Sequence, residues 1–129
     1  MSEPFTPASL EPEHKGLRYV VLRHEGIQSP HFDFMVESAP GALLATWRSI
    51  VWPPDPAQPV EKVPDHRREY LDYEGPVCHD RGNVVRVETG VCQHSIAKFD
   101  IHVYVLEGPP ERKIMMRATG EDKWVLWQV

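Results

Sequence analysis

Cysteine is scarce in this sequence. The chain contains two, Cys78 and Cys92, which is too few for the disulfide framework that stabilises many small secreted domains. The two residues are also too far apart in the sequence to form a Cys-x-x-Cys metal or redox motif. We therefore expect two reduced thiols in a protein that works in a reducing compartment.

A basic excess is also missing. The sequence has 14 Lys and Arg residues against 19 Asp and Glu residues, and its formal net charge is −5. Proteins that coat long nucleic acids carry many basic residues, which displace counterions from the phosphates, so this composition argues against tight non-specific coating. It leaves room for an enzyme that contacts only the end of a strand, because such an enzyme needs few phosphate contacts.

Long apolar runs and a targeting segment are lacking as well. No apolar run approaches the roughly 18–20 residues that a membrane-spanning helix needs. The first residues, Met1-Ser-Glu-Pro4, have neither the basic start nor the apolar core of a signal peptide. We expect a cytoplasmic protein without a membrane partner.

Helical periodicity is short throughout, and 13 prolines interrupt the chain too often for a helical bundle. Hydrophobic residues make up 41% and charged residues 26% of the chain, which is typical of a single globular domain. Residues 1–16 contain three prolines and no apolar periodicity, so they predict a flexible N-terminal arm. The folded domain is expected to span residues 17–129.

The remaining pattern is that of an all-β protein. About eight short strands, separated by turn residues, favour a closed barrel or a sandwich, since closure removes exposed strand edges. The proline-rich segment Trp52–Pro59 predicts a loop. The expected strands are Arg18–Arg23, His31–Glu37, Ala42–Val51, Arg68–Glu74, Val84–Thr89, Phe99–Leu106, Lys113–Ala118 and Trp124–Val129.

The segment His31–Glu37 contains a candidate metal site. Strand alternation places His31 and Asp33 on the face opposite Phe32 and Phe34, and His24 lies upstream across a predicted turn. Two antiparallel strands would bring the two histidines and the carboxylate together, a ligand set that suits Mn²⁺, Fe²⁺ or Zn²⁺. The alternative interpretation is a row of polar residues facing solvent on a half-exposed strand.

The segment Asp65–Tyr70 contains a candidate phosphate site. If it is extended, His66, Arg68 and Tyr70 share a face, and their side chains offer three donors to a tetrahedral anion. His66 is also able to protonate a leaving oxygen. The alternative is a charged strand exposed to solvent.

These segments and several others resemble the 3′-phosphoesterase domain of bacterial DNA ligase D. That family has a histidine ahead of a His-Tyr-Asp-Phe-Arg-Leu-Glu strand, followed by Ser-Trp-Ala-Val-Pro, Asp-His-Pro-Leu-Glu-Tyr and Asp-Phe-Glu-Gly segments. The segments that match in the same order are Tyr19–His24, His31–Glu37, Thr46–Ile50, Asp65–Tyr70 and Asp72–Gly75, with weaker similarity at Gly82–Gly90 and Lys123–Trp127.

The resemblance implies a small closed or nearly closed β-barrel of about eight strands with a ligand groove. It also implies a manganese-dependent activity that removes a 3′-phosphate or a terminal 3′-ribonucleoside in DNA repair. The family's metal ligands match His24, His31 and Asp33, and its catalytic, phosphate-contacting pair matches His66 and Tyr70. The expected partners are a nucleic-acid 3′ end, or another phosphoester, and a separate DNA ligase.

One departure from the family concerns the phosphate. The family's phosphate-binding arginine in the first strand motif is Met35 here, so another cation has to replace it, and Arg68 and Arg48 are the candidates. If neither does, the alternative function is a catalytically weak or inactive metal-containing module that binds phosphate-bearing ends or a repair partner. A barrel kept only for protein contacts is a third possibility.

Overall fold

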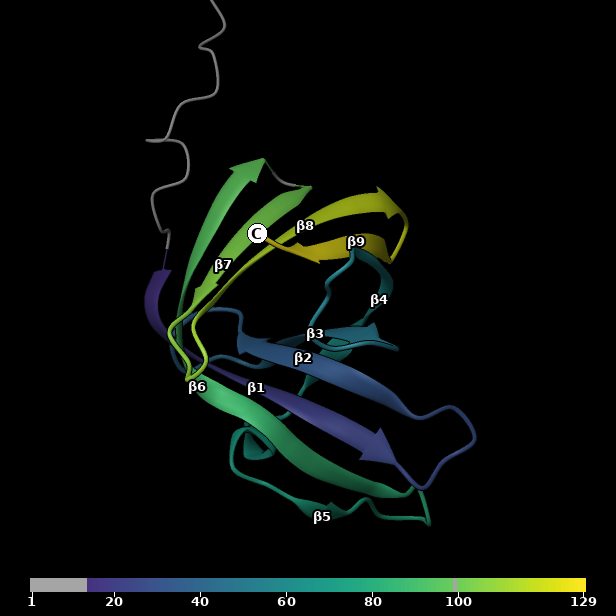
Figure 1. Ribbon diagram of the computed structural model, residues 1–129. Helices are drawn as coiled ribbons and strands as arrows, with labels where there is room; N and C mark the ends of the chain where they lie inside the picture. The colour runs from purple at the N-terminus through teal and green to yellow at the C-terminus, as the bar shows by residue number, and fades with distance from the viewer. Residues whose placement is uncertain (1–13, 99) are drawn as a thin grey trace, which may run out of the picture.

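The computed structural model describes residues 14–98 and 100–129, and they form an all-β, closed, eight-strand antiparallel barrel (Figure 1). Most of the expected N-terminal arm lies outside the described residues, and the first strand begins at His14 rather than at Arg18. Within the described part of the chain, no helix is long and apolar enough to cross a membrane. The expected fold class is therefore confirmed.

Nine strands and one 3-10 turn make up the described structure. The turn, η2, covers Arg68–Leu71 and follows directly on the fourth strand. The strands are β1 (His14–Glu25), β2 (His31–Glu37), β3 (Leu44–Ser49), β4 (Gln58–His66), β5 (Gly75–Pro76), β6 (Asn83–Lys98), β7 (Ile101–Leu106), β8 (Arg112–Gly120) and β9 (Lys123–Gln128).

Closure depends on β1, which pairs with β2 on one side and with β6 on the other. The order around the barrel is β1-β2-β3-β4-β9-β8-β7-β6, and every neighbouring pair is antiparallel. The two-residue strand β5 adds to the free side of β6 without taking part in closure (Figure 1). The eight main strands thus leave no open sheet edge between β1 and β6.

Two of the expected elements are wrong, and both lie between β3 and β5. The expected strand Arg68–Glu74 is instead the turn η2 followed by irregular chain. A strand that the sequence did not predict, β4, begins inside the proline-rich segment at Gln58. Its buried apolar residues, Val60 and Val63, are three positions apart and therefore lie on opposite faces of the strand, so they do not show the period of two that predicts a strand.

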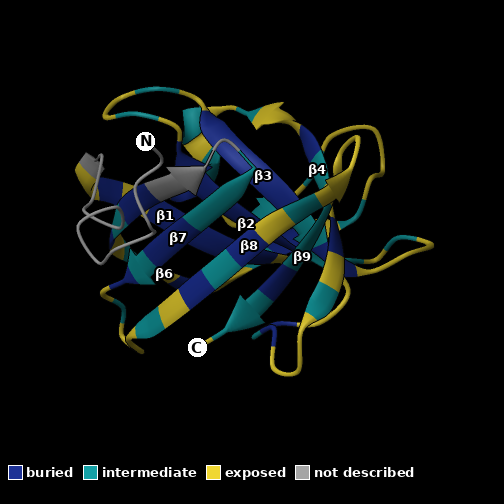
Figure 2. Ribbon diagram, turned by 90° about the horizontal axis from the view of Figure 1, so that it is seen from above, coloured by how far each residue is buried: buried dark blue, intermediate teal, exposed yellow. Residues whose placement is uncertain are grey.

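Two hydrophobic clusters lie on opposite faces of the same strands. The inner cluster contains residues of all eight main strands, such as Phe34 and Leu126, and therefore fills the barrel. The outer cluster draws only on β1, β2, β3 and β6 and is covered by Leu71 of η2. Figure 2 shows buried residues along these strands and exposed residues mainly in the connecting loops.

The turn η2 is fastened to the outer face of β2 by an ion pair between Arg68 and Glu37. Glu37 is 4% exposed and also accepts hydrogen bonds from the backbone N–H groups of Arg18, at 2.6 Å, and Gly41, at 3.1 Å. Burial alone would raise the pKa of Glu37, but these donors outweigh it and hold the pKa below its usual value. Arg68 also donates to the carbonyl oxygen of Ala42, at 2.9 Å.

We expect Arg68→Met to lower the free energy of unfolding by about 1–2 kcal/mol, because it removes a charge-assisted donor from a buried carboxylate. The figure is at the low end because 39% of the Arg68 side chain is exposed, so solvent screens the pair. Urea unfolding at neutral pH measures the change. The neighbouring variant Arg67→Met is the control and should stay within about 0.5 kcal/mol of wild type; equal effects of the two would contradict the role given to Arg68.

The lowered pKa of Glu37 predicts a pH dependence of stability. A carboxyl whose pKa is lower in the folded state stabilises the fold above its unfolded pKa, and this stabilisation is lost as pH falls through the folded value. The gap in unfolding free energy between wild type and Glu37→Gln should therefore be large at pH 7 and should narrow below about pH 4.5. Urea titrations at several pH values measure it, with the exposed-site variant Glu121→Gln as control. A gap that stays constant with pH would show that Glu37 does not titrate in this way.

Candidate metal centre

The candidate metal ligands lie on the outer face of β2 and on the neighbouring strand β1. Alternation is as expected: Phe34 and Val36 belong to the inner cluster, whereas His31, Asp33 and Met35 face outward and are buried there. His24 on β1 lies directly opposite His31 in the register of the two antiparallel strands. The sequence prediction that these strands bring the two histidines together is confirmed.

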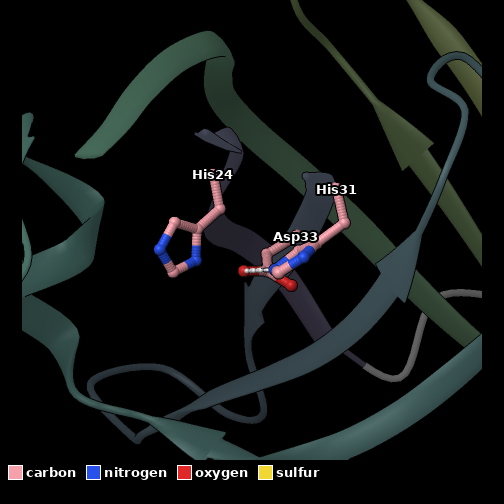
Figure 3. Close-up of side chains that lie close together, drawn as sticks. All are labelled: His24, His31 and Asp33. Carbon is pink, nitrogen blue, oxygen red and sulfur yellow. Dashed lines mark ion pairs between the residues drawn. The ribbon is translucent and has the colours of Figure 1, made fainter. Parts of the chain in front are cut away.

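The geometry of the group permits one metal ion. One ligand atom from each of His24, His31 and Asp33 lies within 4.8 Å of the others. His31 Nε2 is 3.3 Å from Asp33 Oδ2, and the two imidazole ring centroids are 5.1 Å apart (Figure 3). This arrangement is able to hold a metal ion, whose identity the ligand set alone does not fix.

Backbone carbonyl groups determine which ring nitrogens are free to bind. His24 Nε2 is 2.5 Å from the carbonyl oxygen of Arg81, and His31 Nδ1 is 2.9 Å from that of Ser29. A carbonyl oxygen only accepts, so each of these nitrogens carries the proton and donates it. His24 Nδ1 and His31 Nε2 are left as the ligand atoms, with their rings oriented as in known metal sites.

A buried nitrogen without a hydrogen-bond partner supports this assignment. Among the described residues, His31 Nε2 has no well-aligned hydrogen bond, although Asp33 Oδ2 is 3.3 Å away. An unprotonated nitrogen facing a carboxylate oxygen at this distance is repulsive unless a cation lies between them. A metal ion, or a second proton on the ring, satisfies both atoms.

Asp33 is kept ionised by its neighbours. It is 2% exposed, and burial by itself would raise its pKa, but the charges and contacts of His31, Arg48 and His66 outweigh burial and lower the pKa. Arg48 Nε approaches Asp33 Oδ1 at 3.3 Å. One carboxylate oxygen therefore faces the histidine and the other faces an arginine.

The group opens into a hollow of about 140 Å³, which we call the site hollow. It brings together most of the side chains that the sequence singled out, and they come from β1 to β4 and from the η2 turn. The residues that line it are His24, Asp33, Met35, Arg48, His66, Tyr70, Val77, Arg81 and Val84.

His66 and Tyr70 meet as expected, although the segment between them is not extended. His66 ends β4, and the 3-10 turn folds Tyr70 back toward it, so that the ring centroids are 5.7 Å apart in an edge-to-face arrangement. His66 Nδ1 is 2.9 Å from the carbonyl oxygen of Pro64. That contact places the proton on Nδ1 and leaves Nε2 free to exchange a proton at the hollow.

Arg68 is where the prediction from strand alternation fails. The turn directs it to Glu37 and Ala42, away from the site hollow, and alternation does not apply to a 3-10 turn. Arg48, the other candidate, does line the hollow. Met35 lies in its wall, is 1% exposed and packs into the outer cluster, so an apolar residue suits this position.

Arg81 is a site residue that the sequence analysis missed. It lines the hollow and holds His24 through its carbonyl group, but it belongs to a loop with no periodic pattern. The close approach depends on Gly82, where a Cβ atom would lie 2.2 Å from the carbonyl oxygen of Glu25 and where φ is +76°. Gly82 was the feature of the sequence that could have predicted this contact, because glycine often allows a close approach of two backbone segments. The sequence does not identify the second segment.

We expect wild-type protein to bind one Mn²⁺ ion per chain and the double variant His31→Ala, Asp33→Ala to bind it about 100-fold less tightly or worse, since two of three ligands are lost. Calorimetric titration measures this. His24 is half-buried, so His24→Gln is a milder variant for use if the double variant unfolds. The control is His79→Ala, because His79 is exposed and lies outside the group. Equal Mn²⁺ affinity in wild type and in folded His24→Gln would contradict the assignment.

No model of a known protein family matches the chain, and a search of curated proteins finds no significant match. The structure by itself shows an eight-strand antiparallel barrel with a His-His-Asp group that can hold one metal ion. The fold is the one that the resemblance to the ligase D phosphoesterase domain implies.

Proposed function

We propose that the protein is a divalent-metal-dependent phosphoesterase that acts on nucleic-acid 3′ ends in DNA repair, and removes a 3′-phosphate or a terminal 3′-ribonucleoside. The observation that supports it best is the composition of the site hollow. Two ligands of the candidate metal group and the His66–Tyr70 pair line the same small space, and the third ligand, His31, lies directly behind it.

The chemistry of these side chains fits phosphate. His24 Nδ1, His31 Nε2 and Asp33 would hold the divalent ion, which would polarise a phosphoryl oxygen and lower the pKa of bound water. Arg48 is anchored on Asp33 through Nε, and its terminal nitrogens supply further donors to a phosphate oxygen. The hydroxyl of Tyr70 is a neutral donor at the same hollow.

In this proposal, His66 serves as the general acid. In hydrolysis, an oxygen atom of water bonds to phosphorus and releases one proton to solvent, while the bond between phosphorus and the sugar oxygen breaks. The leaving oxygen needs a proton, and a His66 imidazolium supplies it from Nε2, since Nδ1 is held by Pro64. Manganese is the metal that the family resemblance favours, with zinc and iron as alternatives, and the proposed setting is cytoplasmic, beside a separate DNA ligase.

A second candidate function is a metal-containing module that binds phosphate-bearing ends, or a repair partner, with little or no turnover. One observation favours it. Met35 is buried and apolar where the family has an arginine, and Arg68 is occupied by Glu37, so Arg48 and Arg81 are the guanidinium groups at the hollow. An assay of phosphate release from a 3′-phosphorylated primer separates the two functions, because a binding module binds the end without releasing phosphate.

We expect Mn²⁺-loaded wild type to release phosphate from a 3′-phosphorylated primer and His66→Ala to lower kcat by about 10²–10³, as expected for loss of a general acid or of one aligned donor. A divalent-metal panel tests the metal, and His79→Ala serves as the matched control. Retention of full turnover by folded His66→Ala would reject this role. Absence of phosphate release from wild type with every metal, with the end still bound, would favour the binding module.

A further inference from the structure

A second hollow adjoins the site hollow and is larger, at about 520 Å³; we call it the outer hollow. The two share four lining residues, Arg48, His66, Tyr70 and Arg81, so they are continuous across these side chains. A volume of about 140 Å³ accommodates a phosphate group but is well below that of ordinary ligand sites. The rest of any nucleotide whose phosphate lies at the metal group must therefore lie outside the site hollow.

Three guanidinium groups surround the outer hollow: those of Arg48, Arg67 and Arg81. Within the described part of the chain, Arg81 uses two of its five N–H donors, from Nε to the carbonyl oxygen of Cys78, at 3.0 Å, and from Nη2 to Cys78 Sγ, at 3.4 Å. The Arg67 side chain is 70% exposed and lies 4.0 Å from Glu69. An ion pair this exposed contributes little to the stability of the fold. Arg67 thus contrasts with its neighbour Arg68, which stabilises the fold.

Two carboxylates also line the outer hollow, and both have basic neighbours. Asp65 accepts from Lys62 Nζ at 3.3 Å, and Glu61 lies opposite Arg48 in the β3–β4 register. The arginines at this hollow exceed the carboxylates, although the chain as a whole carries a net charge of −5. A phosphate at this hollow therefore meets a less negative surface than the net charge of the chain suggests.

We propose that the outer hollow is a second anion subsite, in which Arg67 and Arg81 bind the phosphodiester next to the reacting 3′ end. This inference rests on the proposed function and narrows it, since a ligand with two successive phosphates fills both hollows. The substrate class is then an oligonucleotide end and not a small ester with a single phosphate. Arg67 acts on the outer subsite alone, whereas Arg81 lines both hollows.

The test compares two ligands that differ by one nucleotide: thymidine 3′-phosphate, with one phosphate, and the 3′-phosphorylated thymidine dinucleotide, with two. Both are titrated into Mn²⁺-loaded protein carrying His66→Ala, so that they are not consumed. We expect the dinucleotide to bind about tenfold more tightly than the mononucleotide. Arg67→Gln should remove most of this preference and leave mononucleotide affinity unchanged, and Arg81→Gln should weaken the dinucleotide more than the mononucleotide.

Salt dependence gives a second readout. Salt screens a contact between an arginine and a phosphate, so Arg67→Gln should make dinucleotide affinity less dependent on salt and leave the salt dependence of mononucleotide affinity unchanged. Arg86→Gln is the control, since this arginine pairs with Glu74 at 3.7 Å on another part of the surface. An Arg67→Gln protein that keeps the full preference, or loses both ligands equally, would overturn the inference alone. If neither the mononucleotide nor the dinucleotide binds to protein in which Arg67 is intact, the proposed function is overturned as well.

Discussion

Burial of both faces of β2 is the constraint on which the remaining structure depends. A strand with one solvent-exposed face needs apolar residues at alternate positions only. In β2, Phe34 and Val36 pack inside the barrel, and the residues on the opposite face, Asp33 and Glu37, are nearly as buried. Buried carboxylates are costly unless donors meet them. The 3-10 turn, the outer cluster and the neighbouring arginines all help to satisfy that requirement.

The two carboxylates of β2 are satisfied in different ways, and the difference separates structure from chemistry. Glu37 accepts from two backbone N–H groups and a guanidinium, which leaves it little capacity for another ligand. Asp33 has a guanidinium on one oxygen and, on the other, a histidine nitrogen whose alignment forms no hydrogen bond. Two carboxylates on the same face of β2 thus have different uses. Glu37 stabilises the fold at one end of the strand, and Asp33 retains the capacity to bind a cation at the other.

Strand periodicity predicted the parts of the site that lie on strands. His31 and Asp33 share a face because side chains alternate, and His24 meets them because a short turn makes β1 and β2 antiparallel. Periodicity carries no information about irregular segments, so it assigned Arg68 to the groove and missed Arg81, whose place depends on a glycine contact with a distant strand. His66 and Tyr70 do lie together, but alternation predicted this from an extended segment, whereas the 3-10 turn brings the two rings together.

The closed order of the strands divides the molecule into two arcs with separate duties. Of the described residues that line the site hollow, none comes from β7, β8 or β9; those three strands face the interior with residues such as Tyr104 and Leu126 and complete the barrel. Packing is not all that holds the arc from β7 to β9, because Arg112 of β8 pairs with the buried Glu88 of β6 at 2.6 Å and donates to Gln128 of β9. A ligand in the site hollow therefore contacts side chains of one arc only, while the other arc supports that arc from across the barrel interior.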